Sequence, residues 1–180
     1  MVKYLLALVI SFSAAAESEL GVSYSRINQK LDFAQPIHFK MDAIQLSYTK
    51  YWLGGLGTEI AVARSTETPN AYFIDKHYQN KINALWSAHV VYKRPVTDRL
   101  NIKAGVGITE YHSTWRVNGV EPDWSKGTDS HKPSWFIGIQ YDWHKWLTFE
   151  AGYRFQYEKT KVGYGEETTD SITSGITVRF

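Results

Sequence analysis

The stretch Ser171–Phe180, with the sequence SITSGITVRF, decides the fold that we predict for this chain. Successive side chains of a β-strand point to opposite faces, so this stretch has one apolar and one polar side. The apolar side carries Ile172, Ile176, Val178 and Phe180, and the polar side carries Thr173, Gly175, Thr177 and Arg179. An aromatic residue at a chain end is unusual for a soluble protein, because such ends are normally solvated. The pattern is typical of a last strand that closes a barrel whose outer face contacts lipid.

The N-terminal residues have the pattern of a secretory signal peptide. Lys3 is followed by the apolar run Tyr4–Phe12 and by the small residues of Ser13–Ala16. This pattern predicts a signal peptide over residues 1–16 and a single barrel domain over residues 17–180. The alternative is an N-terminal anchor helix, but the apolar run is shorter than the roughly 20 residues that a spanning helix needs. The sequence has no cysteine, which excludes disulfide bonds and a lipid anchor of the lipoprotein type.

The rest of the chain alternates with the period of β-strands. The 20 Lys and Arg of the full sequence are balanced by 18 Asp and Glu without clusters, so nothing indicates nucleic-acid binding. Period-two alternation recurs, whereas a helical period does not. We expect eight strands, over residues 19–27, 42–52, 56–65, 82–93, 100–117, 134–143, 147–159 and 171–180. Long connections are expected at 28–41, 66–81, 118–133 and 160–170. This layout predicts an all-β, eight-stranded antiparallel up-and-down transmembrane β-barrel.

The two faces of these strands distinguish a lipid-facing barrel from a soluble one. One face is apolar, and the other carries mostly Gly, Ser, Thr, Ala and Gln, which suits the tight lumen of an eight-stranded barrel. The alternative, a secreted soluble barrel of the lipocalin type, would carry many more Lys and Glu outside. Aromatic residues near the strand ends predict girdles at both membrane interfaces. Glu110 interrupts the apolar face, so we expect it above the bilayer or beside a bulge that would also turn Trp115 toward lipid.

These features together resemble small Gram-negative outer-membrane barrels. The resemblance rests on the signal peptide, the eight strands, the four long loops, the stretch Glu150–Phe155 and the terminal strand ending in Phe180. The chain looks most like the OmpA-like transmembrane domain, the opacity-protein porin family and the OmpX/Ail group. The resemblance implies a location in the outer membrane and insertion by the barrel assembly machinery, with Ile176, Val178 and Phe180 as assembly signal and girdle. The chain lacks the periplasmic peptidoglycan-binding domain of full-length OmpA, so cell-wall anchoring is not implied.

Ionisable residues fall on the predicted inner face of the strands. They are Glu59, His89, Lys103, Glu150 and Arg154. Buried charges must be paired or hydrogen-bonded, because an isolated charge in a low-dielectric interior costs several kcal/mol or more. We therefore expect an interior polar network that fixes a largely filled barrel. The alternative is that this network gates a narrow path for ions or small solutes.

Catalysis and metal binding have little support in the sequence. A lipid A-modifying deacylase needs a Ser, a His and an acid together on the lipid-facing side, but His112 and Ser113 are adjacent and point to opposite faces of a strand. The six His are scattered, so we expect neither a metal site nor a cofactor. The long loops carry aromatic and charged residues, such as Tyr72 and Trp124, suited to contacts with host surfaces, phage or lipopolysaccharide. We predict a structural or adhesin-like monomer in outer-membrane lipid.

Overall fold

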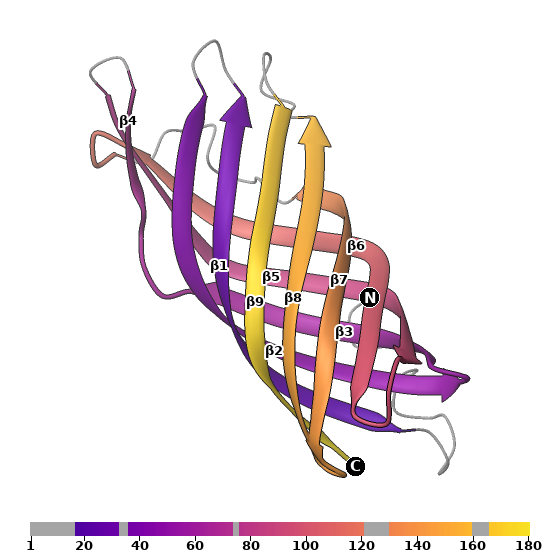
Figure 1. Cartoon of the computed structure of the whole chain (residues 1–180). Coiled ribbons are helices and arrows are strands. Elements are labelled where there is room, and N and C mark those ends of the chain that lie inside the picture. The colour runs from indigo at the N-terminus through magenta and orange to yellow at the C-terminus, as the bar shows by residue number, and fades with distance from the viewer. Residues whose placement is uncertain (1–16, 33–35, 74–75, 121–129, 160–165) are drawn as a thin grey trace.

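The computed structural model describes residues 17–32, 36–73, 76–120, 130–159 and 166–180. The strands are β1 (Ser18–Asp32), β2 (Ile37–Leu53), β3 (Leu56–Ser65), β4 (Asn70–Phe73), β5 (Lys76–Pro95), β6 (Leu100–Val117), β7 (Ser130–His144), β8 (Leu147–Lys159) and β9 (Glu166–Arg179). Their order is β3-β2-β1-β9-β8-β7-β6-β5-β4, and an additional pairing of β3 with β5 closes eight of them into a barrel (Figure 1). The predicted all-β, eight-stranded antiparallel barrel is confirmed.

One segment of the prediction receives no test from this fold. The predicted signal peptide, residues 1–16, lies outside the described residues and stays a prediction. None of the described residues forms a helix that is both long and apolar enough to cross a membrane.

The two ends of the barrel differ in their connections. At one end, which we name the turn end, short turns join β2 to β3, β5 to β6 and β7 to β8. Gly54 and Gly55 have φ of 53° and 87° in the first turn, which suits a tight type I′ hairpin. The ladder between β1 and β9 ends here, where Ser18 and Phe180 exchange two backbone hydrogen bonds of 3.0 Å. The opposite end, which we name the loop end, carries the other connections.

The strands extend further toward the loop end than we predicted. Parts of all four expected loops, 28–41, 66–81, 118–133 and 160–170, belong to strands. In β2, for example, Phe39 and Met41 are at most 1 % exposed and point inward, while His38 and Lys40 are exposed. The alternation therefore continues past the expected strand end, but the apolar side chains now face the interior. A search for apolar side chains on the outer face could not recognise these segments as strands.

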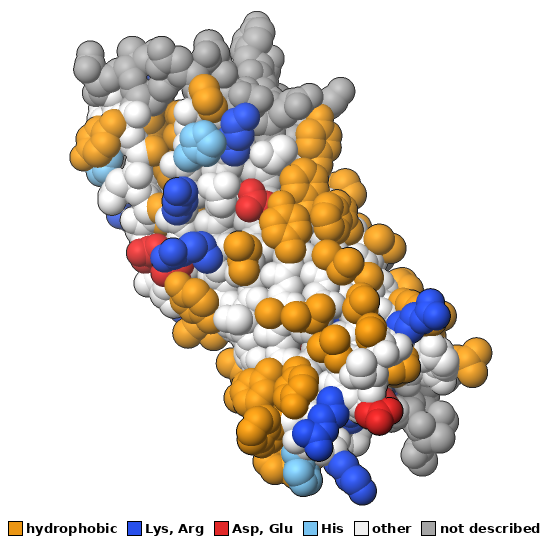
Figure 2. Space-filling model, viewed as in Figure 1, with side chains coloured by type: hydrophobic (Ala, Val, Ile, Leu, Met, Phe, Trp, Pro, Cys, Tyr) orange, Lys and Arg blue, Asp and Glu red, His pale blue; other side chains and the backbone are white. Residues whose placement is uncertain are grey.

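Outward-facing apolar side chains form a band around the barrel. Members that are more than 40 % exposed include Leu20, Val22, Tyr24, Ile44, Leu46, Trp86, Val90, Ile102, Val106, Ile108, Ile137, Ile139, Ile172 and Ile176. Figure 2 shows this band across one face of the molecule, with charged side chains mainly toward its two ends. A soluble monomer rarely exposes an apolar patch of more than a few hundred Å². A lipid-facing barrel requires such a continuous band.

A β-bulge on β5 changes which of its side chains face the interior. The register between β5 and β6 shifts between Ile82 and Ala84, so Asn83 is the extra residue. Ile82, which we expected on the outer face, is instead buried inside at 1 % exposure. Glu110 lies on β6, which pairs with β7 in regular register, so the bulge lies on β5 and not on the strand of Glu110. The side chain of Trp115 lies outside the described residues.

Candidate functional site

The middle of the barrel interior holds a buried group of opposite charges. Lys103 on β6 lies 2.7 Å from the carboxylate of Glu59 on β3, and Arg154 on β8 lies 3.3 Å from it. All three side chains are at most 7 % exposed. The Thr49 hydroxyl donates to Glu59 at 3.3 Å and accepts from Lys103 at 3.1 Å. One carboxylate therefore links side chains from opposite parts of the barrel wall across the lumen.

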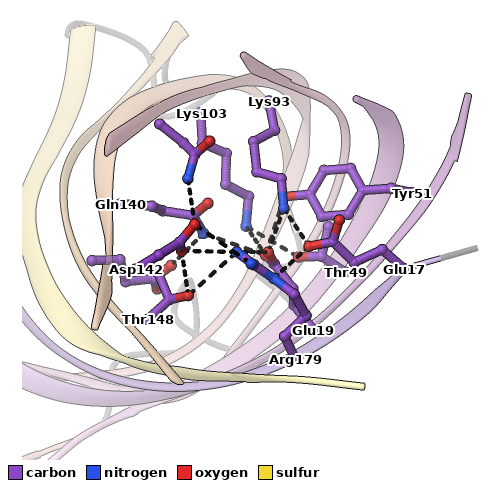
Figure 3. A network of polar contacts seen from close by, with 12 residues as sticks. Glu17, Glu19, Thr49, Tyr51, Lys93, Lys103, Gln140, Asp142, Thr148 and Arg179 are labelled. Atoms are coloured by element: carbon purple, nitrogen blue, oxygen red, sulfur yellow. Dashed lines mark hydrogen bonds and ion pairs between the residues drawn. The ribbon is translucent and has the colours of Figure 1, made fainter. Parts of the chain in front are cut away.

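A second acid, Glu19 on β1, connects this group to the turn end (Figure 3). Its carboxylate lies 2.8 Å from Nζ of Lys93 and 3.9 Å from Nζ of Lys103. The Tyr51 hydroxyl donates to it at 3.1 Å, and the Gln140 amide at 3.3 Å. Glu19 is 1 % exposed, so these partners replace the water that the carboxylate has lost.

Charged residues also hold the rim of the turn end together, where the first and last strands meet (Figure 3). Arg179 lies 2.5 Å from Glu17 and 2.9 Å from Asp142, and Lys93 lies 2.6 Å from Glu17. We name these four residues the rim clasp. Burial alone would raise the pKa of Asp142, but hydrogen bonds from Thr148 and Arg179 and the Arg179 charge hold this pKa below its ordinary value. The clasp joins β9, β7 and β5 at the rim.

The other two residues predicted for the interior network lie beside its ion pairs. Glu150 accepts a hydrogen bond of 3.3 Å from Gln140, which also bonds to the Glu19 carboxylate. A ring nitrogen of His89 lies 2.8 Å from the Ser134 hydroxyl, and the ring packs edge-on against another aromatic ring of the lumen. Of the five predicted residues, Glu59, Lys103 and Arg154 are thus in direct contact. Glu150 joins them through the Gln140 amide, and His89 lies in a neighbouring layer.

A small cavity of about 40 Å³ lies against this network. Its lining includes Gln45, Glu59, Lys103, Phe136, Gln140, Glu150 and Arg154. A polar cavity holds water once it exceeds roughly 10–15 Å³, provided that the water finds two to four polar partners. Gln140 Oε1 and Arg154 Nε have no hydrogen-bond partner among the described residues. The cavity therefore suits a few waters that satisfy these buried atoms.

The interior near the loop end has the opposite character. An apolar core lies there, made of Ile27, Leu31, Ile37, Phe39, Met41, Ala43, Ala63, Ile82, Leu85 and Tyr111. One buried cation, Lys132 on β7, lies against it, with Nζ 4.8 Å from the centre of the Tyr111 ring. A polar pair is enclosed between the same strands, where the Asn80 amide donates to Gln29 at 2.6 Å. The lumen therefore consists of two parts, which we name the charged half, toward the turn end, and the apolar half, toward the loop end.

The outer surface brings some predicted residues together without forming a catalytic or metal site. Nε2 of His112 and of His131 lie 3.4 and 3.5 Å from the carboxylate of Glu110. Ser113 follows His112 on a regular strand, so it points to the opposite face. The described part of the chain contains no group of three His, Cys, Asp or Glu residues that could hold a metal ion.

Comparison with known proteins shows the kind of barrel. No family model matches the chain, and no curated protein matches it. Neisserial surface protein A matches with a TM-score of 0.59 at 14 % identity, over 89 % of this chain and 97 % of that chain. The chain has the fold of a small outer-membrane β-barrel. Ail of Yersinia pestis, solved with the heparin analogue sucrose octasulfate, matches with a TM-score of 0.58 at 13 % identity, over 92 % and 99 %. OprG of Pseudomonas aeruginosa matches with a TM-score of 0.57 at 10 % identity, over 92 % and 95 %.

Sequence reasoning missed several residues of this outer-membrane-type lumen. Glu19 and Lys93 have the same phase as the inward-facing residues of their strands, so the alternation contained a signal for them. Gln140 also has the inward phase, but a neutral amide draws no notice in a search for charges. Glu17 precedes the first strand and has no periodic signal at all. The rim clasp could therefore be recognised only once the barrel was closed in three dimensions.

Proposed function

We propose that this chain is an integral protein of the Gram-negative outer membrane, with a structural or surface-interacting role and a lumen that does not conduct. The observation that carries this proposal is the filled interior. An eight-stranded barrel is just wide enough for side chains to fill it. Here an ion-paired half and an apolar half occupy the described interior, and the cavity against the ion pairs measures only about 40 Å³.

Each half opposes permeation for a different physical reason. In the charged half, a path requires Lys103 or Arg154 to leave Glu59, and separating a buried pair costs roughly 3–5 kcal/mol. In the apolar half, an ion would have to pass the packed side chains of Phe39 and Ile82, which offer it no polar contact, and this desolvation costs several kcal/mol or more. Both halves would have to open together, so we favour a filled barrel over a gated channel.

The apolar band supports the membrane setting of this proposal. An even number of strands leaves both chain ends at the turn end, which would face the periplasm, while the loop end would face outward. Ile176, Val178 and Phe180 are 46, 39 and 71 % exposed on the outer face. We assign them the role of assembly signal and girdle, read by the barrel assembly machinery after export by the signal peptide.

The loop end would carry the surface-interacting role. Its strands stand beyond the apolar band, so loops there would reach host, phage or lipopolysaccharide groups. Ail was solved with a heparin analogue, which makes a sulfated or phosphorylated ligand a reasonable candidate for this barrel. We propose no catalytic role, and an unchanged lipid A mass in cells that express the chain is the expected result.

Current recording in planar bilayers tests the filled lumen. We expect the inserted barrel to give no stepwise current under conditions in which a porin conducts. A gated channel would give openings whose amplitude or frequency changes in Glu150→Gln, because this residue lines the cavity. Glu67→Gln, a matched change at an exposed position, should leave such openings unchanged. Stepwise openings of that kind would refute the filled-lumen proposal.

A further inference from the structure

The outward-facing charges above the apolar band are unevenly distributed around the barrel. On the described parts of β1, β2 and β3 the cations are Arg26, Lys30, Lys40 and Arg64. Two acids, Asp42 and Glu67, accompany them. At the same height on β7–β9, the outward side chains that the structure describes include His131, Tyr157 and Asp170, and the side chain of Lys159 is not among those described. Figure 2 shows blue and red side chains beside each other above the band, on the side where Figure 1 places β1 and β2.

These cations begin where the apolar band ends. Arg26 is two residues beyond Tyr24, the last apolar outward residue of β1. Arg64 lies directly opposite Ile44 in the ladder between β2 and β3. Two residues of a strand rise about 7 Å. The guanidinium groups therefore lie at the height at which lipid headgroups would surround a barrel that is inserted by this band.

The local contacts leave cationic groups available on this flank. Nε of Arg26 lies 3.2 Å from the Asp42 carboxylate, yet the Arg26 side chain is 69 % exposed. The same bond, from Arg26 Nε to Asp42, holds the Arg26 side chain in place. Arg64 and Lys40 are exposed and have no hydrogen bond or ion pair with any described residue. We name Arg26, Lys40 and Arg64 the basic flank.

We propose that the basic flank binds the phosphate groups of an anionic lipid headgroup in the surrounding leaflet. Arginine presents a planar fork that matches phosphate oxygens, and two such forks lie here, on β1 and β3, each just beyond the apolar band. A lipid fits better than a soluble polyanion, because both guanidinium groups adjoin the band, where a lipid's chains would lie against Tyr24 and Ile44. The inference rests on the proposed membrane function and adds a site and a ligand class to it.

Lipid selection in nanodiscs tests this site. The barrel is inserted into phosphatidylcholine nanodiscs that contain either bisphosphorylated lipid A or its dephosphorylated form, and native mass spectrometry identifies the lipids retained. We expect the wild-type chain to enrich the bisphosphorylated form, and R26Q/R64Q to enrich it roughly thirtyfold less, because two surface cations near the headgroups are lost. K81Q/R116Q, which removes two outward cations of β5 and β6, should behave like the wild type.

The other outcomes overturn the proposal in distinguishable ways. Equal enrichment in the wild type, R26Q/R64Q and K81Q/R116Q would show that no selective flank exists. Displacement of the retained lipid by a heparin oligosaccharide at equal charge would assign the flank to a soluble polyanion. A wild-type chain that folds by heat-shifted electrophoretic mobility but does not insert would refute the membrane function itself, and this inference with it.

Discussion

The charged half and the apolar half of the interior follow opposite rules, although the same strands build both. In β2, Leu46 faces outward and Gln45 inward in the charged half, whereas Lys40 faces outward and Phe39 inward in the apolar half. A polar exterior over an apolar interior is the rule for proteins in water. The inversion therefore marks the height at which the surroundings of the barrel change, in our proposal from lipid to water. Above that height the barrel is built like a soluble domain.

The two halves should also lose stability for different reasons when a residue is replaced. A buried polar network depends on complete pairing, because removal of one partner leaves an uncompensated charge. An apolar core depends on packing, so its losses scale with the volume that is removed. Variants in each half, measured on one protein, test this difference directly.

The largest effect is expected in the charged half. Lys103→Met removes the base that lies 2.7 Å from Glu59 and 3.9 Å from Glu19, and it leaves the network with excess negative charge. We expect the free energy of unfolding in lipid vesicles, measured by urea titration, to fall by about 4 kcal/mol. The double variant E59Q/K103M neutralises both partners and should lose clearly less. An equal loss in the single and double variants would show that packing, and not charge pairing, governs this half.

A somewhat smaller effect is expected in the apolar half. Phe39→Ala empties a site that is 0 % exposed, and it should lower the free energy of unfolding by about 3 kcal/mol in the same titration. Tyr72→Ala removes an aromatic ring that is 80 % exposed, and it should change this energy by less than about 0.5 kcal/mol. If both variants were equally harmless, the apolar half would not be a packed core.

The smallest effect concerns the rim clasp and depends on pH. The pKa of Asp142 is lowered in the folded state, so its contribution is complete above the unfolded value of about 3.8 and is lost as the pH falls through the folded value. Asp142→Asn should reduce stability by at most about 1 kcal/mol at neutral pH, because the group is partly exposed. The difference between wild type and variant should shrink below about pH 4. A difference that stays constant from pH 7 to pH 3 would contradict this assignment.

Alternation in the sequence was sufficient to predict the barrel but not its full height. The strands under the apolar band have apolar residues on one phase, so Leu20, Val22 and Tyr24 indicated β1 directly. The same strand continues beyond Ile27 to Leu31 on the other phase, and a single rule for both halves treats residues after Ile27 as a loop. Within the lumen, inward phase alone selected Glu59, Lys103 and Arg154, because charges on that phase have nowhere else to lie.

The remaining contacts could not be predicted, because they depend on closure and register. Glu17 lies near Arg179 only after β9 pairs with β1, and no local pattern reports that distance. Nothing in the residue type of Asn83 marks it as the extra residue of a bulge. We therefore assigned Ile82, which precedes it, to the wrong face of the strand. Pairing across the lumen between β1 and β5, as in the contact of Gln29 with Asn80, has the same origin.

The bulge at Asn83 makes the length of β5 as informative as its composition. Inside and outside on a strand are a matter of parity, and one added residue reverses that parity for everything beyond it. Loss of Asn83 would leave Ala84 opposite His112 and Ile82 opposite Ser113 in a regular ladder, so Ile82 and Asn80 would stay inside and Lys81 outside. A single-codon deletion here would thus be absorbed by the bulge, whereas the same deletion in a strand without a bulge would turn every side chain beyond it to the opposite face.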